Sequence, residues 1–190
     1  EQKETFADMK IGSIIGLLLI YFILAWVFKS WTRPFTIMIM IPFAFIGAVL
    51  GHYLLGLTMS ILSMFALLAL AGIVVNNSII LVSTIERRFD DLRNENDKSY
   101  DDDKIINEAI ITGVVDRFRP VLLTSLTTIG GLSALLFEKS LQAQFLIPMA
   151  ATIVFGLAIT AFLVLIIVPS MIGISRDFSH FLKIFRMDKK

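Results

Sequence analysis

The chain has 190 residues, of which 56% are hydrophobic and 17% are charged. Because a typical soluble domain carries about 25% charged residues, this composition excludes an ordinary water-soluble protein. The sequence contains no cysteine, which excludes disulfides and thiolate metal sites. We expect no cofactor, no metal centre and no nucleic-acid partner.

The charged residues are segregated from five apolar stretches that contain no Asp, Glu, Lys or Arg. A helix that crosses a bilayer needs about 20 apolar residues. The sequence therefore predicts an all-α membrane protein with five transmembrane helices, with Gly56–Thr58 as the tight turn between the second and third. His52 and Tyr53 precede this turn, where their amphipathic rings suit a membrane interface. The predicted spans are residues 11–28, 34–55, 59–84, 120–137 and 145–174.

Lys and Arg are distributed unequally between the two sides of these spans. Fourteen of the 17 lie in residues 29–33, in the connection 85–119 and in the tail 175–190, and three lie on the other side. The positive-inside rule places the connection and the tail in the cytoplasm and the N-terminus outside. No positively charged leader precedes the first span, and five is an odd number of spans for paired repeats. We expect the chain to be a C-terminal piece of a longer protein.

The predicted cytoplasmic loop 85–119 contains a pattern typical of an amphipathic helix. The acidic run Asp101–Asp103 suits a helix N-terminus, and apolar residues recur behind it at helical spacing. We expect a surface helix near residues 103–115 that lies on the membrane face and ends near Gly113. The apolar residues are Ile105, Ile106, Ala109, Ile110 and Val114.

Polar side chains intrude into the spans on both sides of this loop. Asn77 lies nine residues before Glu86 and Thr128 lies nine residues after Arg119, so at 1.5 Å per residue both are about 13 Å in from the cytoplasmic edge. Because the two spans are antiparallel, the Asn pair can share one level with Thr127 and Thr128. The polar residues are Asn76 and Asn77 in the third span, with Arg117 before the fourth span and Thr124, Thr127 and Thr128 within it.

Two interpretations of this polar cluster stay open. Amides and hydroxyls can bridge transmembrane helices for about 0.6 kcal/mol per contact, or they can line a proton or ion pathway. Asn cannot titrate, and no carboxylate occurs in any predicted span. A proton-coupled machine that uses these helices would therefore need an acid from elsewhere.

Several strings resemble the C-terminal membrane half of a resistance-nodulation-division (RND) efflux permease of the hydrophobe/amphiphile exporter type. They occur in the expected order and cover nearly all of residues 10–172. The strings are SWTRP at 30–34, IPFA at 41–44, AGIVVNNS at 71–78, RFRPVLLTSLTT at 117–128, QAQFLIPMA at 142–150 and VP at 168–169.

The resemblance implies a specific architecture. Such permeases have twelve transmembrane helices in two halves, and the five spans here look like helices eight to twelve. Residues 1–10 would be the periplasmic end of a porter domain. Proton uptake in the family centres on an aspartate pair in the N-terminal half. Asn76 and Asn77 would then face this pair at the relay, and Arg117 and Thr124 would line the cytoplasmic proton path.

The resemblance also implies a function. The chain would be part of a proton-driven exporter of hydrophobic or amphiphilic compounds in the bacterial inner membrane, with a periplasmic N-terminus and a cytoplasmic C-terminus, and not an enzyme. Its partners would be the N-terminal half of the permease in a homotrimer, a periplasmic adaptor, an outer-membrane channel and the lipid bilayer. Two alternatives are a SecD/SecF-type protein-export subunit and a truncated, non-transporting membrane scaffold.

Overall fold

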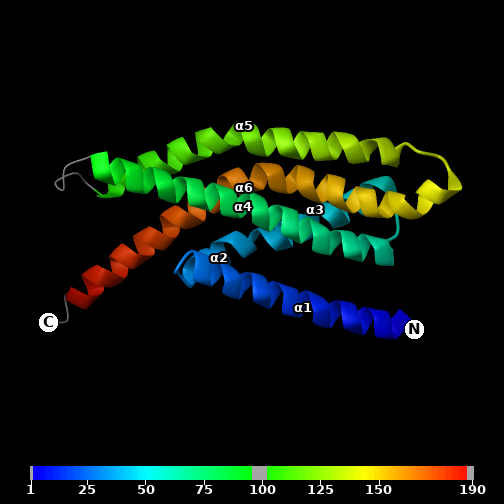
Figure 1. Ribbon diagram of the computed structural model, residues 1–190, viewed down its shortest axis with the longest axis horizontal. Coiled ribbons are helices and arrows are strands. Elements are labelled where there is room, and N and C mark those ends of the chain that lie inside the picture. The colour runs from blue at the N-terminus through cyan, green and yellow to red at the C-terminus, as the bar shows by residue number, and fades with distance from the viewer. Residues whose placement is uncertain (1, 96–101, 188–190) are drawn as a thin grey trace. The chain divides into compact units, whose positions relative to one another are not determined.

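The computed structural model describes the backbone of residues 2–95 and 102–187 and the side chains of residues 7–95 and 104–175. The described residues form helices and contain no strand, which confirms the all-α prediction. Figure 1 shows the helices in chain order. They are α1 (Gln2–Val27), α2 (Thr32–Met38), α3 (Met40–Leu55), α4 (Ile61–Glu95), α5 (Asp102–Leu136) and α6 (Leu141–Met187).

Five helical stretches are long and apolar enough to cross a membrane, which confirms the predicted number of transmembrane helices. In the second stretch, α2 and α3 are separate helices with a break at Ile39. Pro42 explains the break, because it has no N–H to donate to the carbonyl of Met38. The stretches are Ala7–Val27, Thr32–Leu55, Ile61–Glu95, Lys104–Leu136 and Leu141–Ser175.

The chain divides into two compact units, Glu1–Ile39 and Met40–Lys190. In the first unit, α1 ends in a Schellman motif in which Ser30 N–H donates to the Ala25 carbonyl. Lys29 occupies its left-handed position with φ 47°. The Tyr21 hydroxyl donates to the Trp31 carbonyl at 3.1 Å, which links α1 to the start of the next helix.

In the second unit, α6 packs against α3, α4 and α5. The helices α3 and α6 approach closely because α3 carries the small-residue motif Gly47-xxx-Gly51. A Cβ on Gly47 would lie 3.0 Å from both the Gly156 Cα and the Phe155 carbonyl oxygen. A Cβ on Gly51 would collide with the Phe155 side chain. These contacts place α6 at the centre of the second unit.

The turn between α3 and α4 is a second Schellman motif, with Gly56 at φ 63° and Leu57 N–H donating to the His52 carbonyl at 2.9 Å. The tight turn predicted at this position is therefore confirmed. His52 itself differs from the prediction, because its side chain is 3% exposed and its neighbour Tyr53 is 84% exposed. The His52 Nε2 lies 3.0 Å from Ser63 Oγ, so the imidazole connects α3 to the start of α4.

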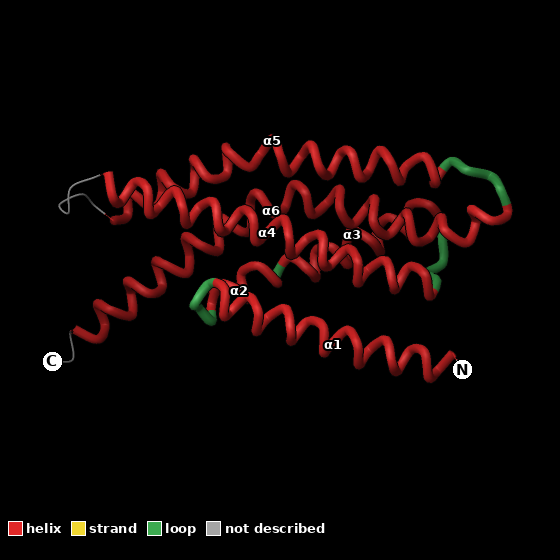
Figure 2. The backbone as a smooth tube through the Cα atoms, viewed as in Figure 1, coloured by secondary structure: helices red, strands yellow, loops and turns green. Residues whose placement is uncertain are grey.

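The connection predicted at 85–119 is not a loop along most of its length. The helix α4 continues to Glu95 and α5 begins at Asp102, so the two form a long antiparallel pair (Figure 2). Residues 96–101, including the polar centre of the predicted loop, lie outside the described residues. The helices α1 and α6 also extend beyond the predicted spans, into residues predicted as a porter-domain end and a tail.

The predicted surface helix is the first part of α5 and does not end near Gly113. Its apolar residues pack against α4 rather than lying free for the membrane face, and a buried cluster forms from Phe89, Ile105, Ile106 and Ala109. Gly113 allows the same close packing one turn further on, because a Cβ there would lie 2.8 Å from the Ile85 Cγ1. The amphipathic pattern is therefore explained by the packing of α5 against α4.

Candidate functional site: a polar cavity between α4 and α5

A cavity of about 250 Å³ lies between α4 and α5, with a wall contributed by α6. Because α4 and α5 are antiparallel and in contact, polar residues distant in sequence reach the same level. The cavity is lined by Ile73, Asn76, Asn77 and Ile80 of α4, by Arg117, Pro120, Val121, Thr124, Ser125 and Thr128 of α5, and by Leu157 of α6.

Five of the six predicted site residues line this cavity, and Thr127 does not. A helix turns about 100° per residue, so Thr124 and Thr128 lie about 40° apart. Thr127 lies about 60° from Thr124 on the other side, away from the cavity. Its hydroxyl is exposed and donates to the carbonyls of Leu123 and Thr124. The i, i+3, i+4 spacing therefore identified two of the three threonines correctly, and Thr127 lies at the edge of the predicted face outside the cavity.

The threonine hydroxyls of the cavity are already committed to the backbone of α5. Thr124 Oγ1 donates to the carbonyls of Pro120 and Val121 at 3.0 and 3.1 Å, and Thr128 Oγ1 donates to the Thr124 carbonyl at 2.9 Å. Their hydroxyl hydrogens are used, so within the cavity these side chains act as acceptors.

Ser125 is a cavity residue that the sequence reasoning missed. Its side chain is 2% exposed, and its Oγ has no hydrogen-bond partner among the described residues. A buried hydroxyl without a partner is uncommon in proteins. The adjacent Thr124 makes the backbone contacts typical of helical hydroxyls, so no sequence signal separated Ser125 from its neighbours.

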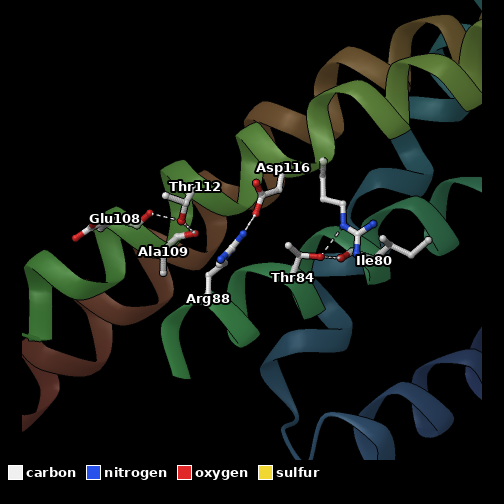
Figure 3. Close-up of polar contacts among 8 residues, drawn as sticks. Ile80, Thr84, Arg88, Glu108, Ala109, Thr112 and Asp116 are labelled. Atoms are coloured by element: carbon white, nitrogen blue, oxygen red, sulfur yellow. Dashed lines mark hydrogen bonds and ion pairs between the residues drawn. The ribbon is translucent and has the colours of Figure 1, made fainter. Parts of the chain in front are cut away.

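The half-buried Arg117 is held against α4. Its Nε–H donates to Thr84 Oγ1 at 2.6 Å, and Thr84 Oγ1 donates to the Ile80 carbonyl at 2.8 Å. Figure 3 shows Thr84 and Ile80 on one face of α4. Thr84 was not predicted as a site residue because it makes no pattern of its own. Arg119, two residues further along α5, is exposed and does not line the cavity.

The acid adjacent to Arg117 in sequence is engaged elsewhere. Asp116 accepts from Arg88 of α4, with Oδ2 2.7 Å from an Nη atom and 2.8 Å from Nε (Figure 3). The Arg88 side chain is 47% exposed and the Asp116 side chain is 39% exposed, so solvent and salt screen this ion pair. Neither residue lines the cavity.

The cavity therefore has one permanent positive charge and no carboxylate among its lining residues. Asn, Ser and Thr do not titrate, and a guanidinium donates hydrogen bonds but accepts none, so the lining contains no carboxylate or imidazole that could take up and release a proton. Among the described residues no group of three or more His, Cys, Asp or Glu could hold a metal ion. Chemically, the cavity suits an anionic or proton-sharing group brought by another segment.

A family model described as the AcrB/AcrD/AcrF family matches residues 1–174. The chain belongs to the AcrB/AcrD/AcrF family. This membership confirms the predicted relation to RND efflux permeases and favours it over the SecD/SecF-type alternative. The matched region contains every residue that lines the cavity.

Curated proteins with different printed functions are similar to the chain over most of its length. It is 30% identical over 168 residues to the swarming motility protein SwrC of Bacillus subtilis (strain 168), covering 87% of the chain and 15% of that protein. It is 28% identical to the multidrug resistance protein MdtC of Enterobacter sp. (strain 638), covering 88% of the chain and 15% of that protein. It is 29% identical to the nickel and cobalt resistance protein CnrA of Cupriavidus metallidurans, covering 73% of the chain and 12% of that protein.

A solved structure agrees with this assignment. The crystal structure of a heavy metal efflux pump superposes with a TM-score of 0.76 at 25% identity, and the match covers 91% of the chain and 16% of the pump. The chain thus spans about 15% of the length of the curated relatives it matches. The fold and the family are shown over this portion, and the activities of the whole relatives belong to much longer proteins.

Proposed function

We propose that this chain is the C-terminal membrane part of a proton-driven exporter, and that the proton pathway passes through the cavity between α4 and α5. The observation that carries the proposal is the combination of the Arg117 charge with neutral amides and hydroxyls and no lining carboxylate. A charge in a partly desolvated cavity needs a counter-charge, and a proton-driven machine needs a group that titrates. One carboxyl group from another segment meets both needs.

The titrating acid in this proposal is the aspartate pair that the family resemblance assigns to the N-terminal half. A nearby positive charge stabilises the ionised form of a carboxyl group. Arg117 therefore favours the ionised acid, and proton uptake removes the attraction between the acid and the guanidinium. The amides of Asn76 and Asn77 orient the acid or bridging water, because an amide both donates and accepts.

The proposal includes an orientation in the bacterial inner membrane. The excess of Lys and Arg in residues 29–33, 85–119 and 175–190 supports a cytoplasmic C-terminus and a periplasmic N-terminus. The end of α4 and the start of α5 then lie on the cytoplasmic side, and Arg117 stands at the cytoplasmic end of the cavity. Family membership supports a homotrimer with a periplasmic adaptor and an outer-membrane channel.

The cargo has two candidate classes. The family resemblance of the sequence strings favours hydrophobic or amphiphilic compounds, in line with the name of the MdtC relative. The name of CnrA and the heavy metal efflux pump structure favour metal ions as the second candidate. Ethidium and Ni²⁺ are suitable probes of the two classes. A permease that moves protons with ethidium alone supports the first class, and one that responds to Ni²⁺ alone supports the second.

The decisive experiment measures proton flux in proteoliposomes that contain the permease, with this chain joined to or co-expressed with its N-terminal half. A pH dye inside the vesicles reports proton movement on addition of ethidium or Ni²⁺. We expect Arg117→Ala to lose most of the coupled flux or to move its pH dependence upward, because the acid is protonated more easily without the guanidinium beside it.

Arg119→Ala is the matched control, since it removes the same charge two residues away without touching the cavity. Thr124→Ala and Thr127→Ala form a second pair, in which one hydroxyl lines the cavity and the other does not. The proposal predicts reduced flux for Arg117→Ala and Thr124→Ala alone. Wild-type flux and pH dependence in both variants would refute it and favour the scaffold alternative.

A further inference from the structure

The Arg117 guanidinium is fixed by a chain of two hydrogen bonds that ends on the backbone of α4. Arg117 Nε donates to Thr84 Oγ1 at 2.6 Å, and Thr84 Oγ1 donates to the Ile80 carbonyl oxygen at 2.8 Å. The direction of this chain cannot reverse, because a guanidinium only donates and a carbonyl oxygen only accepts. Thr84 therefore uses its hydrogen on its own helix and offers its oxygen lone pair to Arg117.

This arrangement determines which part of Arg117 is available to the cavity. The guanidinium carries five N–H donors, and the Nε–H is the one committed to Thr84. The two amino groups at the end of the side chain carry the other four donors. Anchoring Nε to Thr84 restricts the rotamers of a long, flexible side chain, so less conformational entropy is lost when these donors are held in one direction.

The neighbouring serine shows that the contact is more than the usual bonding of a helical hydroxyl to its backbone. Ser83 Oγ donates to the same Ile80 carbonyl at 3.0 Å, but the side chain is exposed and receives no hydrogen bond from Arg117. Both hydroxyls thus donate to the backbone of α4, but of the two only Thr84 Oγ1 also accepts a hydrogen bond from the guanidinium. This pair provides a matched control one residue away.

We propose that Thr84 is a positioning residue for proton transfer in the cavity. It holds the Arg117 guanidinium so that its charge and its terminal amino groups face the acid that enters the cavity. The inference rests on the proposed function of the cavity. It assigns to α4 a role in setting the pKa of that acid through Arg117, without direct contact between Thr84 and the acid.

The test is the pH dependence of coupled proton flux in proteoliposomes that contain the permease, with ethidium and Ni²⁺ as probes. Thr84→Val keeps the shape of the side chain and removes the hydroxyl. We expect its half-maximal pH to move upward, in the same direction as in Arg117→Ala and by a smaller amount. Thr84→Ser restores the acceptor and should return the wild-type profile, and Ser83→Ala should leave the profile unchanged.

A double-mutant cycle separates positioning from packing. Lys has no Nε–H group at this place in the side chain, so Thr84→Val should produce no further pH shift in an Arg117→Lys background. An equal shift in both backgrounds would overturn the inference. Thr84→Ala replaces Thr84→Val if the latter does not reach the membrane in wild-type amounts.

The outcomes also separate this inference from the proposed function. If Arg117→Ala shifts the profile and Thr84→Val does not, the cavity function stands and the role of Thr84 is wrong. If neither substitution changes the profile, the proposed function fails and the role of Thr84 fails with it. A shift in Thr84→Val that Thr84→Ser reverses supports both.

Discussion

Ile85 of α4 lies directly against Gly113 of α5. A Cβ on Gly113 would lie 2.8 Å from the Ile85 Cγ1 and 3.1 Å from its Cα. The contact stands between the buried cluster around Phe89 and the polar contacts of Thr84 with Arg117. The separation of α4 and α5 beside the cavity is therefore set by a glycine that lies outside the cavity.

Gly113→Ala should push α4 and α5 apart and destabilise the protein. The added methyl would overlap backbone as well as side-chain atoms of Ile85, and overpacking of this kind costs about 1–3 kcal/mol. Thermal melting of the detergent-purified permease measures the effect as a lower Tm. Gly130→Ala is the control, because a Cβ there meets nothing within 4 Å. An unchanged Tm for Gly113→Ala would show that the helices separate at no cost.

His52→Leu should lower stability because it breaks a buried link between α3 and α4. The Nδ1 atom lies 3.0 Å from the Ala48 carbonyl, which can only accept, so Nδ1 carries a hydrogen; the Nε2 atom lies 3.0 Å from Ser63 Oγ and accepts from it in the neutral imidazole. Loss of such bonds in a buried site costs about 1–3 kcal/mol. Tyr53→Leu removes an exposed ring one residue away and should change the Tm less. Equal melting of the two variants would contradict a structural role of the imidazole.

Ser125→Ala should leave the Tm unchanged or raise it. The hydroxyl is buried and has no partner in the described part of the chain, and removing an unsatisfied polar group also removes its desolvation cost of about 1–3 kcal/mol. Ser78 is the matched buried serine, because its Oγ donates to the Val74 carbonyl at 2.9 Å. We expect Ser78→Ala to melt lower than Ser125→Ala in the same detergent. The reverse order would mean that water or another segment satisfies Ser125 in the permease.

The number of membrane helices and the level of the polar cluster could be predicted because both follow from regular spacing. Apolar length indicates a span. The 1.5 Å rise per residue brought Asn77 and Thr128 to the same depth, and the two do line one cavity. The tight turn at Gly56 was equally predictable, because a glycine there can adopt a positive φ.

The contacts that position the site could not be predicted in the same way. The amphipathic pattern around Ile105 is compatible with a membrane surface or a partner helix, and only the fold shows that it packs on Phe89. Thr84 is one hydroxyl among many until the antiparallel pairing brings Arg117 within 2.6 Å. Ser125 differs from Thr124 only in its hydrogen bonds, which depend on side-chain rotamers and leave no trace in sequence.

Asn76→Leu distinguishes a relay from a packing contact. Asn76 is exposed in the described chain and lines the cavity, so its amide is available to the acid of the N-terminal half. We expect the variant to keep the wild-type Tm in the detergent-purified permease and to lose coupled proton flux, because leucine can neither donate nor accept. Asn76→Gln keeps the amide and should retain part of the flux. A lower Tm with normal flux would instead assign Asn76 to helix packing, since amides that bridge membrane helices contribute about 0.6 kcal/mol each without any role in transport.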